Sequence, residues 1–254
     1  MSLVLVEKQS PHISVVTLNR PERRNALTIE LMTELTAAIE TAAADEIQRV
    51  LILRGAGAAF CTGLDLNEAA EMLKAHASAE MVAKTLVTLS QTRLITIAVV
   101  HGAAVAGGAG IMSACDFVIA AERTKIGYPE VRRGLVAGLV MTFLRRQLRE
   151  RDLRELLLTS ELIDAKRAQE IGLVNRVVPP NELENAAQKI AAAILQGAPD
   201  AIANSKRLIE ELWSSSVAED VALALRHHIE ARESDEAKEG IAAFLEKRPP
   251  EWAG

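Results

Sequence analysis

The chain has 254 residues, of which 49% are apolar and 25% charged, a composition typical of a soluble globular protein with a substantial core. Its net charge of −5 argues against general affinity for nucleic acid, so an anionic ligand would need local basic groups or backbone N–H groups. Cys61 and Cys115, the only cysteines, lack the spacing of metal ligands. We therefore expect reduced, buried thiols, a cytoplasmic location and no metal site.

The first quarter of the chain alternates short strands with a helix. Leu3–Glu7 and Ile13–Leu18 are rich in β-branched residues and predict a β-hairpin. Residues 19–25 form an arginine-rich polar turn, which is either a solvated loop or a phosphate contact. Thr28 caps an expected helix with apolar residues at i, i+3 and i+4, and Val50–Leu53 predicts a third strand.

The next motif is a turn between a strand and a helix, Phe60–Leu66. Gly63 permits a positive φ angle, which would turn the following N–H of Leu64 inward. Asp65 can then accept a hydrogen bond from the local backbone and cap the segment that follows. Residues 67–93 are amphipathic and predict one or two helices.

A central stretch, Leu94–Cys115, contains no formal charge. It is long enough for a membrane span, but its histidine and four glycines, without a basic flanking cluster, argue against one. Ile95–Val100 predicts a buried strand, and the glycines from Gly107 to Gly110 predict a turn into a helix. Such a junction is either a packing joint or a site at which unpaired N–H groups stabilise negative charge.

The remainder of the chain is mostly helical. Phe117–Ala120 predicts a strand, and Pro129 begins a helical turn that includes Glu130, either as a complement to the helix dipole or as an acid/base. After three expected helices, Val174–Val178 predicts the last strand. We divide the chain into a core, residues 1–195, and a C-terminal helical lobe, residues 196–254.

Several motifs occur together in the order and spacing of one known family. On them the sequence resembles the crotonase superfamily, also called the enoyl-CoA hydratase/isomerase family, over nearly its whole length. The motifs are Leu18-Asn19-Arg20-Pro21 with Asn25-Ala26-Leu27, Phe60 to Leu66, Gly102 with Ala106-Gly107-Gly108, Cys115-Asp116, Pro129-Glu130, and Phe244 to Arg248.

The resemblance implies an α/β fold: a spiral of repeated ββα units with two roughly perpendicular sheets and a C-terminal helical lobe. It also implies an acyl-coenzyme A substrate, no separate cofactor, and a homotrimer or a dimer of trimers formed through the C-terminal helices. Neither nucleic acid nor membrane is an expected partner. By resemblance, the backbone N–H groups of Leu64 and Gly107 form an oxyanion hole. The implied coenzyme A path includes Arg24, Ala26, Asp65 and Leu66, together with Lys247 from a neighbouring subunit.

The sequence departs from the family pattern at two acidic positions. The first of the two glutamates that hydratases use maps onto Gly110, whereas the second maps onto Glu130. The aspartate of some isomerising members maps onto Gly138. We therefore favour isomerisation of 3-enoyl-CoA to 2-enoyl-CoA, in which one partly desolvated carboxylate moves the proton. Hydration, another reaction that relies mainly on the oxyanion hole (decarboxylation or thioester cleavage), and a non-catalytic CoA-binding scaffold stay as alternatives.

Other polar residues receive simpler interpretations. Arg132 and Arg133 flank the expected acid and could select a polar acyl group, although we favour a solvated helix face for both. His227 and His228 are interpreted as surface or interface residues rather than ligands.

Overall fold

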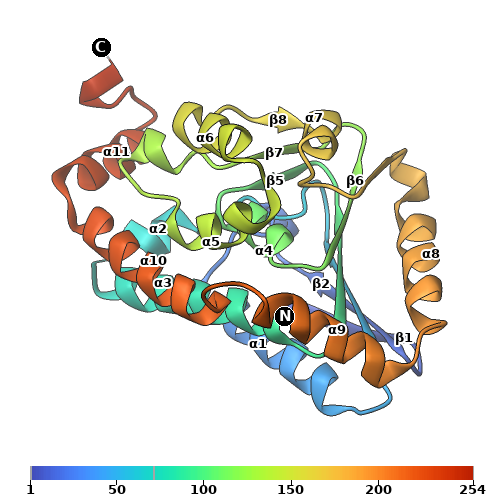
Figure 1. Cartoon of the computed structure of the whole chain (residues 1–254). Coiled ribbons are helices and arrows are strands. Elements are labelled where there is room, and N and C mark those ends of the chain that lie inside the picture. The colour runs from blue at the N-terminus through green and yellow to red at the C-terminus, as the bar shows by residue number, and fades with distance from the viewer. Residues whose placement is uncertain (1, 71, 254) are drawn as a thin grey trace.

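The computed structural model describes residues 2–70 and 72–253, and its elements are shown in Figure 1. The strands are β1 Val4–Ser10, β2 Ile13–Leu18, β3 Val50–Gly55, β4 Ile95–Val100, β5 Ala103–Val105, β6 Phe117–Ala121, β7 Lys125–Gly127, β8 Ile163–Asp164 and β9 Arg176–Val178. The α-helices are α1 Ile29–Ala44, α2 Leu66–Ala70, α3 Met72–Gln91, α4 Gly107–Ser113, α5 Gly138–Gln147, α6 Glu150–Thr159, α7 Ala165–Glu170, α8 Leu183–Leu195, α9 Pro199–Glu211, α10 Val217–Glu233 and α11 Asp235–Glu246. Short 3-10 helices are η1 Pro21–Arg23, η2 Glu130–Arg133, η3 Pro180–Glu182 and η4 Glu251–Ala253.

The larger sheet has six strands in the order β1-β2-β3-β4-β6-β9. β1 and β2 form the expected antiparallel hairpin, and all the other neighbours are parallel. Side chains alternate between its faces, so Ile52 and Ile97 pack with α8 while Leu51 and Leu53 enter the main core. The main core covers one face of the sheet and α8 covers the other. This explains why the sequences of the central strands are continuous apolar runs.

The smaller sheet, β5-β7-β8, begins three residues after the end of β4. Gly102 makes this transition with φ +63°, and a Cβ there would lie only 2.0 Å from the Ala58 carbonyl oxygen. Sequence periodicity did not reveal β5, β7 or β8, because strands of two or three residues are too short to show alternation. The α/β fold with two sheets and C-terminal helices agrees with the fold class inferred from the resemblance.

Element ends differ slightly from those expected. The last strand begins at Arg176 rather than Val174, because Leu173 and Val174 both donate backbone hydrogen bonds to the Ala168 carbonyl at the end of α7. The expected helical segment 67–93 contains most of α2 and all of α3, and the α-helices α8 to α11 follow residue 181. No helix within residues 2–70 and 72–253 combines the length and hydropathy that crossing a bilayer requires.

The C-terminal helices pack against the rest of the chain in different ways. α8 covers the outer face of the large sheet, whereas α10 lies along α3 and α5 (Figure 1). Arg146 of α5 ties α9 to α10, because its guanidinium binds Glu210 at 2.5 Å and Asp220 at 2.9 Å. The boundary at residue 195 stays a prediction.

Asn25 holds the arginine-rich turn against the start of the next motif. It is fully buried and adopts φ +55°, a conformation that Asn tolerates better than most residues. Its Nδ2 lies 2.9, 2.8 and 3.1 Å from the carbonyl oxygens of Ala56, Ala59 and Phe60. Its Oδ1 accepts the N–H of Arg20 at 2.8 Å. One side chain therefore fixes two loops that are thirty residues apart.

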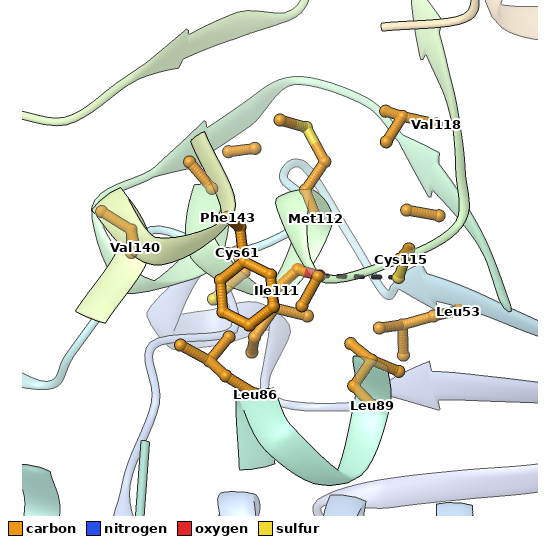
Figure 2. Packing of buried hydrophobic residues seen from close by; sticks show 14 of the residues in the cluster. Leu53, Cys61, Leu86, Leu89, Ile111, Met112, Cys115, Val118, Val140 and Phe143 are labelled. Atoms are coloured by element: carbon orange, nitrogen blue, oxygen red, sulfur yellow. Dashed lines mark hydrogen bonds between the residues drawn. The ribbon is translucent and has the colours of Figure 1, made fainter. Parts of the chain in front are cut away.

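Gly110 allows α4 and α5 to pack closely. A Cβ at Gly110 would lie 2.5 Å from Cγ1 of Val140 and 3.8 Å from Cδ2 of Leu86. Figure 2 shows Val140 and Leu86 beside Ile111 and Phe143 in this cluster. The space that a side chain would need at position 110 is therefore occupied by an apolar side chain of α5.

We predict that Asn25→Ala destabilises the protein by about 2–3 kcal/mol, because several buried polar backbone groups lose their partner. Urea unfolding followed by circular dichroism measures the change. Glu22→Ala, an exposed residue of the same turn, is the matched control and should change stability by less than about 0.5 kcal/mol. Equal stability of the two variants would contradict the role given to Asn25.

We predict that Gly110→Ala costs about 1–3 kcal/mol, because the added methyl overpacks the contact with Val140. In a double-mutant cycle, Val140→Ala should cost less in the Gly110→Ala background than in the native chain. Additive unfolding free energies would show that the two positions do not compete for the same space.

Candidate active site

A cleft of about 570 Å³ opens between the N-terminal loops, η2 and the C-terminal helices. Its described lining residues come from eight separate segments of the chain. They are Glu22, Arg23, Arg24, Ala26, Thr62, Leu64, Asp65, Leu66, Asn67, Val82, Ala103, Val105, Ala106, Gly107, Glu130, Arg133, Leu135, Val136, Ala137, Gly138, Leu139, Val140, Leu162, His228, Phe244 and Leu245. Charged residues gather at residues 22–24, and apolar residues line the wall from 135 to 140.

Two backbone amides meet at one point of this cleft. Gly63 adopts φ +86°, as expected from the sequence, and a Cβ there would lie 3.2 Å from the Gly107 nitrogen. A Cβ at Gly107 would lie 4.0 Å from the Leu64 nitrogen. Among residues 2–70 and 72–253, neither the Leu64 N–H nor the Gly107 N–H has a hydrogen-bond acceptor. The structure therefore brings together the two amides that the sequence predicted.

Neighbouring backbone bonds explain why these amides stay free. The Leu27 carbonyl accepts the Asp65 N–H, and the Leu27 N–H donates to the Gly63 carbonyl, both at 2.8 Å. These two bonds form a β-bridge between Leu27 and Leu64, and the Leu64 N–H faces away from it. Gly107 is the first residue of α4, and the first N–H groups of a helix have no acceptor within it. The preceding residue, Ala106, has φ +52°, which sets the sharp entry into the helix.

Glu130 supplies a buried carboxyl group to the same cleft. It is 9% exposed, and its Oε2 has no hydrogen-bond partner among the described residues. Burial raises the pKa of Glu130 to about 7, although its own backbone N–H and the charge of Arg133 act in the opposite direction. A carboxyl group with this pKa can both accept and return a proton near neutral pH.

The position of Glu130 depends on close packing by α11. The acid begins η2 directly after Pro129, as the sequence predicted. A Cβ at Gly240 would lie 2.5 Å from the backbone of Arg133, and one at Gly134 would lie 2.4 Å from the backbone of Glu236. Gly134, at the end of η2, and Gly240 of α11 therefore let α11 lie directly on the turn that carries Glu130.

Four of the five predicted coenzyme A contacts line the cleft: Arg24, Ala26, Asp65 and Leu66. The Asp65 carboxylate is engaged already, because it binds the Arg20 guanidinium at 2.7 Å and accepts the Asn67 N–H at 3.1 Å. The hydrogen bond from the Asn67 N–H is the cap that the sequence predicted for Asp65. Lys247 ends α11 with φ +56° and does not line this cleft within one chain. Its role in a neighbouring subunit's site stays a prediction.

Sequence interpretation missed two polar residues of the cleft. Arg133 is not on a solvated face, because it is half-buried, lines the cleft and stacks on the Phe244 ring at 4.5 Å. His228 is buried within the cleft wall, while only its neighbour His227 is exposed. Helical spacing could have revealed His228, since it continues the buried stripe of Val217 and Val221 on α10.

Comparisons with known proteins agree with the fold and with the family that the sequence resembles. A family model for enoyl-CoA hydratase/isomerase matches residues 8–254. A Thermus thermophilus protein provisionally named an enoyl-CoA hydratase is 37% identical, over 98% of this chain and 100% of that protein. A mevalonyl-coenzyme A hydratase of Aspergillus fumigatus is 33% identical, over 98% and 94% respectively.

Solved structures give the same result. An enoyl-CoA hydratase from Mycobacterium avium has a TM-score of 0.87 and 32% identity, with 99% of each chain covered. A carnitinyl-CoA hydratase from the same organism has a TM-score of 0.85 and 31% identity, with 99% of this chain and 98% of that one covered. The match in sequence spans almost the whole chain, and the fold agrees. The protein belongs to the enoyl-CoA hydratase/isomerase family of the crotonase superfamily.

Proposed function

We propose that the protein isomerises a 3-enoyl-CoA to a 2-enoyl-CoA, with Glu130 as its only proton-transferring side chain. The observation that carries this proposal is that a buried carboxyl group, whose Oε2 has no hydrogen-bond partner among the described residues, lines the same cleft as two unpaired amides. The other acidic residues of the described lining are unsuited to the role, because Glu22 is exposed at the mouth and Asp65 is paired with Arg20. The charged mouth and apolar wall fit a nucleotide and an acyl chain, respectively.

In this proposal the amides of Leu64 and Gly107 form the oxyanion hole. Removing a proton α to a thioester carbonyl transfers negative charge to the carbonyl oxygen. Two preorganised N–H donors stabilise that charge, and loss of one such donor typically lowers the rate by about 10²–10³. Because both N–H groups lack a competing protein acceptor within residues 2–70 and 72–253, no internal bond has to break when the substrate binds.

The proposed reaction moves one proton over two carbons. The Glu130 carboxylate takes a proton from C2, and the electron pair of that C–H bond forms a C1–C2 double bond while the carbonyl π electrons move to the thioester oxygen, which gives a dienolate. The carbonyl bond then reforms, the C1–C2 pair becomes the C2–C3 double bond, and the pair of the former C3–C4 double bond takes the proton from Glu130 at C4. Proton and electrons balance without any co-reactant.

Packing supports a single-acid reaction. Val140 Cγ1 occupies the space that a Cβ at Gly110 would need, so a second acid at position 110 would require the Val140 side chain to shift. A Cβ at Gly138 would approach the Ala224 carbonyl oxygen to 3.0 Å, so α10 restricts the other position. Hydration requires both a positioned water and a proton donor, and a missing acid/base contact costs about 10²–10⁴ in rate.

Hydration of a 2-enoyl-CoA is the second candidate, and the names of the relatives favour it. The Thermus thermophilus, Mycobacterium avium and Aspergillus fumigatus proteins are all named as hydratases. In this case Glu130 would have to position the water as well as transfer the proton. The two candidates share the oxyanion hole and the acid. They differ in how the enolate forms, by addition of water to C3 or by loss of a proton from C2, and in the carbon that is then protonated, C2 or C4.

We also propose that the active form is a homotrimer or a dimer of trimers. Large apolar side chains of the C-terminal helices are exposed in one chain. They include Leu212, Trp213, Phe244, Leu245 and Trp252. Burial of these side chains between copies would remove an extensive apolar surface from water.

We predict that Glu130→Gln lowers the rate of double-bond migration by about 10²–10⁴, because the amide cannot accept the C2 proton. Purified protein is offered a 3-enoyl-CoA and, separately, a 2-enoyl-CoA, and chromatography separates isomerised from hydrated product. Arg132→Gln, which changes an exposed neighbour on η2, is the control and should retain activity.

Each outcome has a distinct meaning. Migration that survives in the Glu130→Gln variant would contradict the proposal. Efficient hydration by the native protein, without migration, would favour the second candidate. Binding of acyl-CoA without either reaction would favour a scaffold.

We predict that kcat/KM for the isomerisation rises with pH through an apparent pKa of about 7 and then levels off. The sign follows from the chemistry, since the carboxylate form of Glu130 is the base, and burial raises its pKa to about 7. Initial rates between pH 5.5 and 8.5, in buffers of equal ionic strength, measure the profile. Activity that is already maximal at pH 5.5 would show that the free enzyme's base has an ordinary carboxyl pKa.

A further inference from the structure

Arg133 brings a guanidinium group without a counter-ion to the wall of the cleft. Its side chain lines the cleft, and its Cζ lies 4.5 Å from the centroid of the Phe244 ring, which lines the cleft as well. Within residues 2–70 and 72–253, the only hydrogen bond of this side chain runs from Nη1 to the Pro129 carbonyl oxygen, at a long 3.4 Å. No carboxylate in that part of the chain forms an ion pair with it. A partly buried charge without a counter-ion costs free energy and calls for an explanation.

One nitrogen of this guanidinium is open to a ligand. Nε is closed off from water, and it has no hydrogen-bond partner among the described residues. Nη2 also lacks a partner there, but it is not one of the unpaired atoms that are closed off, so it is accessible to solvent. Stacking on Phe244 occupies the face of the guanidinium, whereas its N–H groups point outward from the edge. The Nη2 group can therefore donate to a ligand in the cleft.

Arg133 lies one turn of η2 beyond the acid. Residues i and i+3 of a 3-10 helix lie on the same side, about 6 Å apart along its axis, and both Glu130 and Arg133 line the cleft. Glu130 is not the missing counter-ion, because its Oε2 has no partner among the described residues. Burial lowers the pKa of Arg133 and the charge of Glu130 opposes this, but a guanidinium keeps its proton at neutral pH in any case. An acyl chain with its reacting carbons at Glu130 therefore has a fixed cation close to its path.

We propose that Arg133 binds a carboxylate at the far end of the acyl chain, so that the cleft prefers dicarboxylic acyl-CoA thioesters over plain alkyl ones. The inference rests on the proposed function in one respect, namely that the cleft binds an acyl-CoA with its reacting carbons at Glu130. A carboxylate would give the guanidinium its counter-ion and accept a charge-assisted hydrogen bond from Nη2. A plain alkyl chain would cover the same charge without pairing it, and such sites discriminate against ligands that leave a polar group unpaired.

Direct binding tests this preference without turnover. Calorimetric titration of the full-length protein compares three saturated pairs of equal chain length: glutaryl-CoA with pentanoyl-CoA, adipyl-CoA with hexanoyl-CoA, and pimelyl-CoA with heptanoyl-CoA. We expect the dicarboxylic member of at least one pair to bind about 10–100-fold more tightly, as a hydrogen bond to a charged group allows. The methyl ester of that ligand, which has no charge at the same place, should lose this advantage. Equal affinities within all three pairs overturn the proposal on the native protein alone.

Variants of Arg133 separate recognition of the acyl chain from other roles. In Arg133→Gln the affinity ratio of the best pair should fall to about one, while the plain alkyl thioester still binds and so reports an intact cleft. Arg133→Lys keeps the charge but not the planar fork, and should retain part of the ratio. The matched control is Arg132→Gln, an exposed neighbour on η2 whose guanidinium donates to the Thr159 carbonyl oxygen, and it should leave the ratio unchanged.

Three results with these variants would overturn the proposal. One is an unchanged ratio in Arg133→Gln. Another is an equal loss of affinity for both members of the pair and for coenzyme A itself, which would place the guanidinium on the coenzyme A portion. The third is the same fall in ratio in Arg132→Gln, which would assign the preference to the general positive charge of η2.

The outcomes also separate this inference from the proposed function. If both members of every pair bind with equal affinity, only the preference fails. If no thioester binds, the inference and the acyl-CoA function fail together. If the preference holds but the native protein moves no double bond in a 3-enoyl-CoA, the isomerisation fails and this inference stands.

Discussion

The site depends on the close approach of two backbone segments, residues 61–64 and 104–108. A Cβ at Gly108 would lie 2.3 Å from the Cys61 carbonyl oxygen, and one at Gly63 would lie 2.9 Å from the Val105 carbonyl oxygen. Side chains at these positions would force the segments apart. Glycine therefore permits the distance at which the Leu64 and Gly107 amides can serve one oxygen atom, and the rest of the cleft is arranged around this contact.

A buried acid in the same cleft as these amides carries a cost in stability. Raising the pKa of Glu130 from 4.5 to about 7 corresponds to about 3 kcal/mol, which the folded state loses as pH rises through that interval. Stability falls with rising pH because the unfolded state loses this proton first, while the folded state keeps Glu130 in its neutral form up to a higher pH. The packing of α11 on η2 through Gly134 and Gly240 offsets this cost. The same burial that destabilises the carboxylate makes it a stronger base.

Local sequence features predicted much of the fold and of the site. The positive φ of Gly63, the Thr28 cap, the hairpin and the place of Glu130 after Pro129 follow from chemistry within a few residues, and all are present. The family resemblance supplied the arrangement of the sheets, which periodicity alone did not give.

Features that depend on packing between distant segments were not predictable in this way. Val140 fills the place of a side chain at Gly110, and α10 turns His228 into the cleft while His227 stays outside. Each depends on how one helix is seated on another. Arg133 likewise leaves the solvated face only because Phe244 of α11 provides a ring for its guanidinium. A single sequence does not specify such contacts, since they join residues that lie thirty to more than one hundred positions apart.

The central claim is that one carboxyl group carries the same proton from C2 to C4 while two amides hold the enolate. Following a deuterium label from C2 of a 3-enoyl-CoA in ordinary water tests it most directly, with the 2-enoyl-CoA product analysed by mass spectrometry after a single turnover. The account predicts that part of the label is found at C4, because the buried Glu130 exchanges slowly with solvent. A product whose C4 carries hydrogen from water alone would contradict it.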